Sequence, residues 1–270
     1  MIRTIKFLFV TLSTFFAVIY LLIITYIYFN QSEMVFKATK LASDFKFDYN
    51  QDFEEVNFSS FDGKNLHGLL FKAQNPRGLI FYLHGNAGNL STWGNISEIY
   101  TNLGYDIYIL DYRGFGKSNG NIENEDQVNK DVSLIYRNII KKYDQQKIVI
   151  IGYSIGTGPA SYLASNNPAG KLILQAPFYN FTELSSQAMP FMPNFLKKFS
   201  FKTNTIITKI KFPIYIFHGN KDQVINYENS VRLSKLLKPN DYFFTLNNQN
   251  HIGINENEDY QQQLKIILEK

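Results

Sequence analysis

The sequence predicts an α/β fold in which helices flank a mostly parallel, eight-stranded sheet. Strand and helix patterns alternate from about residue 54 onward in the 270-residue chain, as expected where helices connect parallel strands. Five of the predicted strands are continuous apolar runs, which is typical of strands covered on both faces. An opening hairpin adds an antiparallel edge to the sheet.

The predicted elements follow one another in a regular order. The first two strands, 54–61 and 66–72, are joined at Asp62-Gly63, which is a strong hairpin signal. The six further strands are predicted at 79–83, 106–111, 147–151, 171–175, 212–217 and 242–246. Apolar residues at helical spacing predict helices at about 91–103, 125–143, 155–165, 228–238 and from 259 onward.

A run of 23 uncharged, mostly apolar residues occupies positions 7–29. At about 1.5 Å per residue, a helix of this length spans the roughly 30 Å core of a bilayer. A cleaved signal peptide, which usually has a shorter apolar core, and a buried helix are the alternatives. We expect residues 1–29 to form a transmembrane anchor and residues 30–50 a connector to one domain at 51–270.

The charges around the apolar run bear on its orientation. Arg3 and Lys6 precede it, whereas Lys37 and Lys40 follow it and are partly offset by Glu33. The positive-inside rule slightly favours a cytoplasmic N-terminus. We therefore expect a single-pass membrane protein whose domain is extracytoplasmic.

Composition excludes several functional classes. The net charge of +4 is mild and no Lys/Arg run is present, so no nucleic-acid partner is expected. The chain has no cysteine, which excludes disulfides, thiolate nucleophiles and cysteine-ligated metals. No other cluster of ligand types is visible, so we expect no metal and no other cofactor. The oligomeric state stays open.

Residues 178–211 interrupt the strand–helix rhythm. This 34-residue segment contains two prolines and many Phe and Met residues between two predicted strands. Because ordinary connections are much shorter, insertions of this size are often lids or binding loops. We expect a small lid that either holds an apolar substrate chain or only covers the core.

Ser154 lies in the sequence GYSIG (residues 152–156), which fits G-x-S-x-G. The motif follows the predicted strand 147–151 and opens a helix, the context in which such a serine acts as a nucleophile. The turn exposes the serine oxygen at the carboxyl edge of the sheet, where the helix N-terminus favours developing negative charge. A serine that merely caps a helix is the alternative.

Chain order narrows the choice of a general base among the four histidines. In such sites the serine comes first, then an acid, then the histidine. Only His218 and His251 follow Ser154. His218 has no candidate acid before it, because residues 176–180 (APFYN) contain none. His251 is therefore the expected base.

Asp222 is the expected acid. It follows the predicted strand 212–217 and precedes His251, so its carboxylate could orient the imidazole and stabilise the imidazolium. Glu228 is a less well placed rival. Asp222 could instead be a turn residue, and His251 a surface residue among NNQN.

An acyl-transfer site also needs donors for the oxyanion of the tetrahedral intermediate. The backbone N–H of Ile155, the residue after the serine, is one expected donor. We expect the second from the loop HGNAGN (84–89), with Asn86 as the first choice and Ala87 next. His84 could be catalytic or a metal ligand, but a loop-shaping role is the simpler interpretation.

Five segments, HGNAGN, DYRGFGKSNG, GYSIGTG, HGNKDQVI and NHIG, occur in the order and spacing of the α/β-hydrolase superfamily. They most resemble a membrane-anchored branch of predicted serine hydrolases, over about residues 55–268. Relatives often have glycines before the late histidine, where this chain has NNQN. The resemblance implies an α/β-hydrolase fold, a triad and an oxyanion hole, formed by Ser154, Asp222 and His251 and by Asn86 and Ile155.

These observations lead to an esterase or thioesterase acting on a small-molecule or lipid-like acyl substrate through an acyl-enzyme. Members of the resembled branch have mostly unassigned substrates, and some eukaryotic relatives remove fatty acyl groups from proteins. A peptidase of the same fold is the alternative, although no gating domain and no charged pocket for a peptide terminus is visible. A non-catalytic binding protein is less expected, because it would be free to lose any of the three residues.

Overall fold

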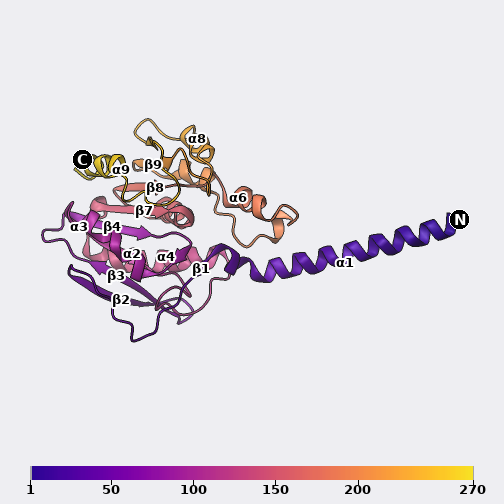
Figure 1. The fold of residues 1–270 in the computed structure, drawn as a ribbon. Helices are drawn as coiled ribbons and strands as arrows, with labels where there is room; N and C mark the ends of the chain where they lie inside the picture. The colour runs from indigo at the N-terminus through magenta and orange to yellow at the C-terminus, as the bar shows by residue number, and fades with distance from the viewer. Residues whose placement is uncertain (1, 270) are drawn as a thin grey trace.

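The computed structural model describes residues 2–269 and contains one large sheet between two layers of helices (Figure 1). Its strands are β2 (Phe53–Ser59), β3 (Asn65–Phe71), β4 (Gly78–Leu83), β6 (Tyr105–Leu110), β7 (Ile148–Tyr153), β8 (Lys171–Gln175), β9 (Ile214–Gly219) and β10 (Tyr242–Leu246). Their order is β10-β9-β8-β7-β4-β6-β3-β2. β3 runs antiparallel to β2 and β6, and the other neighbours are parallel. The predicted sheet is confirmed.

Helices pack on both faces of this sheet. The longer ones are α4 (Glu125–Ile139), α5 (Thr157–Asn166), α8 (Glu228–Ser234) and α9 (Glu258–Glu269). Single 3-10 turns lie at Ile140–Lys142 and Gln145–Lys147. The core is divided accordingly into one cluster that includes Val132 of α4 and Leu163 of α5, and another that includes Leu264 of α9. The strands β4, β6 and β7 are buried throughout, which explains why they are apolar apart from Asp106 in β6.

The single helix expected at 91–103 is wrong in detail. The structure has α2 (Leu90–Trp93), a 3-10 turn at Gly94–Ile96 and α3 (Ser97–Thr101). A Cβ on Gly94 would lie 2.2 Å from the hydroxyl oxygen of Tyr49, which comes from the connector. The glycine at the break therefore allows Tyr49 to approach the backbone.

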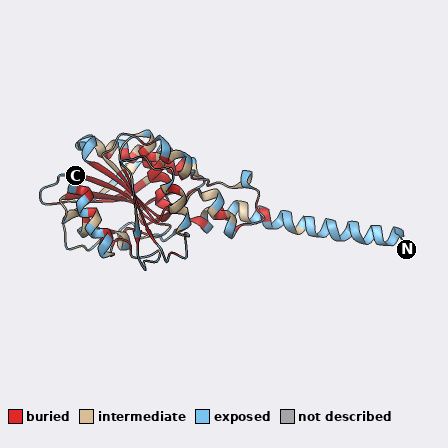
Figure 2. Ribbon diagram, turned by 90° about the horizontal axis from the view of Figure 1, so that it is seen from above, coloured by how far each residue is buried: buried red, intermediate tan, exposed pale blue. Residues whose placement is uncertain are grey.

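The N-terminal helix α1 (Ile2–Val35) projects from the domain, and most of its side chains are exposed (Figure 2). It is long and apolar enough to cross a membrane. The helix continues past residue 29, where the apolar run ends. The side-chain amide of Gln31 donates to Leu196 O at 3.0 Å and accepts from Lys198 N–H at 3.0 Å, so this polar turn is held by the domain.

The chain that follows α1 joins the domain at once. β1 (Lys37–Ala38) pairs in parallel with β5 (Ala87–Gly88), which follows β4. Phe36, immediately before β1, is buried in the core. The segment expected as a connector therefore begins as helix and continues as a strand on the surface of the domain.

The insertion at 178–211, called the lid below, lies beside the domain end of α1 (Figure 1). It contains α6 (Phe181–Ala188), α7 (Thr203–Ile206) and 3-10 turns at Asn194–Leu196 and Ile207–Lys209. Its second half covers the core: a Cβ on Gly158 of α5 would lie 2.7 Å from the Phe201 ring. Its first half faces the site described next.

Candidate active site

Ser154 lies at the turn between β7 and α5, where a 3-10 turn (Ser154–Gly156) begins. Its φ of 54° is in the left-handed region, which non-glycine residues rarely adopt. A Cβ on Gly152 would lie 2.6 Å from Ala160 Cβ, and one on Gly156 would lie 2.1 Å from Leu83 O. The close packing of the turn against α5 and β4 therefore requires glycine on both sides of the serine.

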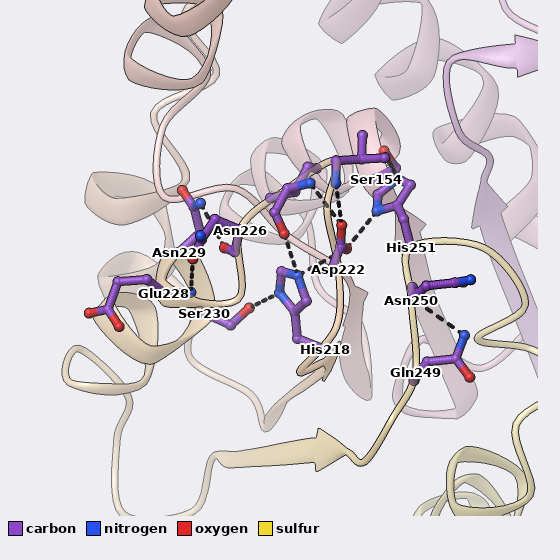
Figure 3. A network of polar contacts seen from close by, with 12 residues as sticks. Ser154, His218, Asp222, Asn226, Glu228, Asn229, Ser230, Gln249, Asn250 and His251 are labelled. Atoms are coloured by element: carbon purple, nitrogen blue, oxygen red, sulfur yellow. Dashed lines mark hydrogen bonds and ion pairs between the residues drawn. The ribbon is translucent and has the colours of Figure 1, made fainter.

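His251 lies between Ser154 and Asp222 (Figure 3). Ser154 Oγ is 2.9 Å from His251 Nε2, and His251 Nδ1 is 2.7 Å from Asp222 Oδ2. An ionised carboxylate only accepts hydrogen bonds, so Nδ1 carries the ring proton and Nε2 is free to accept from the serine hydroxyl. The three side chains follow β7, β9 and β10, far apart in sequence but adjacent at the carboxyl edge of the sheet.

Asp222 is buried and fully engaged as an acceptor. Its Oδ1 accepts the backbone N–H groups of Val224 at 2.8 Å and Ile225 at 2.9 Å. Its Oδ2 faces the rings of both His218 and His251. Burial alone raises the pKa of the Asp222 carboxyl, but the hydrogen bonds from His218 and His251 outweigh it and hold that pKa well below its usual range.

His218 has a role at this site that the sequence analysis missed. Its buried Nε2 is 3.1 Å from Asp222 Oδ2 and 2.8 Å from Ile225 O, so this nitrogen carries a proton. Its Nδ1 is 2.6 Å from Ser230 Oγ, which donates to it in the neutral ring. The only sequence signal is the position of His218 near the end of β9, four residues before Asp222.

Two further residues define the surroundings of the histidine. The hydroxyl of Tyr153, the residue before the serine, donates to the backbone oxygen of His251 and ties its loop to β7. Glu228, the rival acid, is exposed at the start of α8 and points away from His251 (Figure 3). The structure therefore brings Asp222 to the histidine and keeps Glu228 away from it.

The two expected oxyanion donors lie beside the serine. Asn86 and Ile155 both line the cavity at Ser154. The N–H of Ile155 is at the start of a helical segment, where backbone donors lack partners within the helix. The carbonyl oxygen of Asn86 accepts a hydrogen bond of 2.7 Å from Lys37 N–H, so β1 holds this loop.

A cavity of about 670 Å³ opens at Ser154 and His251. Its other walls are mainly apolar and come from the lid and from the last turn of α1: Phe178, Phe181, Leu184, Met189, Met34 and Val35. Among the described residues that line it, the only one with a permanently charged side chain is Lys37. The cavity thus combines a hydrogen-bonded serine–histidine pair with space for an apolar group.

The remaining histidines lie outside the cavity lining. His84 is buried, its Nδ1 is 2.7 Å from Gly85 O, and its ring stacks on Trp93. His67 in β3 contacts Glu55 at 2.9 Å. Within residues 2–269, no group of three or more His, Asp or Glu residues is arranged to hold a metal ion.

Comparisons with known proteins find sequence similarity to hydrolases. A family model described as "Serine aminopeptidase, S33" matches residues 74–207. The uncharacterized protein YfhR of Escherichia coli O157:H7 is 28% identical over 198 residues, which are 68% of each chain. The lysophosphatidylserine lipase ABHD12 of Danio rerio is 28% identical over 187 residues, which are 62% of this chain and 48% of that protein.

Solved structures share the fold at low sequence identity. The Pyrococcus furiosus esterase Pf2001 is similar with a TM-score of 0.71 and 17% identity, over 86% of this chain and 96% of that one. The α/β hydrolase GrgF from Penicillium sp. sh18 is similar with a TM-score of 0.63 and 16% identity, over 81% and 97%. These likenesses show the α/β-hydrolase fold.

Proposed function

Because the chain belongs to the α/β-hydrolase superfamily, we propose that it is a serine hydrolase that cleaves an ester or thioester bond of an acyl substrate. The observation that carries the proposal is the chain of hydrogen bonds from Ser154 through His251 to Asp222, at 2.9 and 2.7 Å, beside an apolar cavity. Ser154 is the nucleophile, His251 the general base and Asp222 the residue that orients it.

The first half of the reaction forms an acyl-enzyme. Ser154 Oγ attacks the acyl carbon while its proton moves to His251 Nε2, and Asp222 stabilises the resulting imidazolium. The negative charge on the carbonyl oxygen is stabilised by the N–H groups of Ile155 and Asn86. His251 then protonates the leaving alcohol or thiol as the bond to the acyl carbon breaks.

Water completes the cycle. His251 takes a proton from a water molecule, whose oxygen attacks the acyl carbon, and the same two N–H groups stabilise the second intermediate. The bond to Ser154 Oγ breaks, the serine recovers its proton from His251, and the carboxylic acid leaves.

A peptidase is the second candidate, since the matching family model is described as a serine aminopeptidase. An aminopeptidase must bind a charged α-ammonium group, which needs a carboxylate once it is removed from water. Among the described residues that line the cavity there is no Asp or Glu, and Lys37 has the same charge as that ammonium. The lining therefore favours an acyl chain.

We also propose that α1 is a single-pass membrane anchor and that the hydrolase domain lies on the extracytoplasmic side. The exposure of α1 along its apolar length supports the anchor. The orientation is inferred from the basic residues that flank the apolar run. Arg3 and Lys6 precede it, whereas Lys37 and Lys40 follow it and are partly offset by Glu33. Carbonate extraction tests the anchor, and release of the full chain into the supernatant would contradict it.

A substrate panel tests the reaction class. The full chain in detergent is assayed on p-nitrophenyl esters of increasing chain length, on a matched thioester and on aminoacyl anilides, with S154A as the blank. We expect the wild type to hydrolyse the esters and the thioester but not the anilides. We expect S154A to hydrolyse none of these substrates. Preferential cleavage of the anilides would support a peptidase. Turnover by S154A equal to that of the wild type would refute Ser154 as the nucleophile.

A further inference from the structure

The tip of the lid, Met189–Leu196, exposes large apolar side chains. Phe191 and Phe195 are 79% and 85% exposed, more than the other large hydrophobic side chains described, on α1 or elsewhere. Pro190 precedes Phe191, and Pro193 lies between Phe191 and Phe195. Exposed aromatic side chains grouped on one loop are costly in water and mark an interaction surface.

The lid tip is docked on α1. Met189 and Met192 form a buried cluster with Ile24 of α1. The hydroxyl of Tyr20 donates a hydrogen bond of 3.0 Å to Phe191 O. The position of the tip along α1 is therefore set by side-chain packing and by a polar contact.

The depth of the tip follows from these contacts. The Nζ of Lys198 lies 4.8 Å from the centre of the Tyr28 ring, so a basic and an aromatic side chain meet at the domain end of the apolar run. Lysines and tyrosines favour this level, the membrane–water interface. Tyr20 precedes Tyr28 by eight residues, which is about 12 Å along a helix axis. Because Tyr20 is hydrogen-bonded to Phe191, Phe191 lies below the interface when α1 spans the bilayer.

Lid tip and cavity are continuous. Met189 packs against Ile24 and also lines the cavity at Ser154, and Met34 and Val35 of α1 line the same cavity. An acyl chain can therefore pass from the side of α1 to the serine along apolar surface, without crossing water.

We propose that the lid tip is inserted into the bilayer in which α1 is anchored, and that the cavity receives an acyl ester from that bilayer. The exposed Phe191–Phe195 surface thus contacts the hydrocarbon region of a membrane. The substrate is a membrane lipid, whose acyl chain enters between α6 and α1. The proposal about the substrate rests on the proposed hydrolase function, whereas the proposal that the tip is inserted does not.

Depth-dependent quenching tests the insertion without any assay of catalysis. The chain has no cysteine, so one introduced cysteine carries the only thiol-linked fluorophore. The full-length F195C variant is compared with I266C on α9, whose native side chain is 41% exposed far from the lid, and with V18C on α1. Each is reconstituted into phosphatidylcholine vesicles that contain lipids spin-labelled on the acyl chain.

We expect quenching at positions 195 and 18 to exceed that at 266 by about fivefold, since only the first two probes meet acyl chains. Equal quenching at 195 and 266 overturns the insertion. Weak quenching at 18 overturns it as well, because α1 would then lie outside the bilayer.

Activity tests the route of the substrate. The full-length F191S/F195S variant removes the exposed aromatic rings but leaves the cavity lining unchanged. We expect its turnover of the soluble ester p-nitrophenyl butyrate to stay within about twofold of the wild type, and its turnover of a fluorogenic lipid ester in vesicles to fall about tenfold or more. Equal loss on both substrates, or no loss on either, refutes entry from the bilayer. Failure of the proposed hydrolase function would give a different result, because S154A would then keep its activity on p-nitrophenyl butyrate.

Discussion

The backbone N–H of Lys37 donates a hydrogen bond of 2.7 Å to the carbonyl oxygen of Asn86. Lys37 is the second residue after α1, and Asn86 lies in the loop that we propose as half of the oxyanion hole. The chain leaving the proposed anchor thus forms a strand directly on a loop of the candidate active site. The position of the anchor and the geometry of the site are therefore physically connected.

A proline at position 37 removes this contact. Since K37P lacks the donor, we expect the Asn86 loop to shift and kcat on a soluble ester to fall about tenfold, less than the roughly 10²–10³-fold loss when an oxyanion donor is deleted. K37A is the matched control, because it loses the same cavity-lining side chain as K37P but keeps the N–H. Equal kcat for K37P and K37A would show that β1 does not position the loop.

His218 is expected to act as a positioning residue. Its Nε2 donates to Asp222, so H218F should lower kcat about 10- to 100-fold at nearly unchanged KM, less than the roughly 10⁴-fold loss that follows removal of a triad acid. H218Q places a donor near the same atom and should recover part of the loss. A purely structural role for His218 would instead lower the melting temperature of H218F and leave its kcat per folded molecule unchanged.

The low pKa of Asp222 predicts how stability depends on pH. A carboxyl whose folded-state pKa is depressed stabilises the fold above its ordinary pKa of 3.8, and this contribution is lost as the pH falls toward the folded-state value. We expect D222N to melt below the wild type by on the order of 5 °C at pH 7. That gap should narrow below about pH 4. A gap that stays constant down to pH 3 would be inconsistent with a paired, ionised Asp222.

Gly156 should tolerate no side chain. In G156A the new Cβ would lie 2.1 Å from Leu83 O and 2.7 Å from His84 O, and both are backbone atoms that cannot move aside. We expect a loss of more than about 3 kcal/mol in the free energy of unfolding. The control is G63A: Gly63 has a φ of +78° but open space around it, so about 1 kcal/mol is expected. Thermal unfolding of both variants checks the difference.

Much of the fold could be predicted because local patterns determine it. The eight strands of the large sheet begin and end within two residues of the predicted ranges, since buried parallel strands are continuous apolar runs, whereas the short strands β1 and β5 were not predicted. The helix break at Gly94 could not be predicted, because Tyr49 approaches it from 45 residues earlier. Likewise, α1 extends past its apolar run because Gln31 bonds to the lid, a contact with no local signature.

The site was only partly accessible from sequence. Chain order and strand ends predict Ser154, Asp222 and His251, and in the structure His251 forms hydrogen bonds to both of the others. Chain order does not identify His218, because it bears only on which histidine can be the base. The contact of His218 with Asp222 depends on the shape of the turn after β9. The contact of Tyr153 with His251 depends on the shape of the loop after β10. Neither shape follows from residue spacing.

Labelling of the intact protein with a fluorophosphonate tests whether Ser154 is the nucleophile, since this reagent reacts with a serine activated by a neighbouring base. The full chain in native membranes is labelled and digested, and the modified peptide is identified by mass spectrometry. We predict one adduct, on Ser154, that is absent in S154A and strongly reduced in H251A. Undiminished labelling of S154A, or an adduct on another residue, would contradict it.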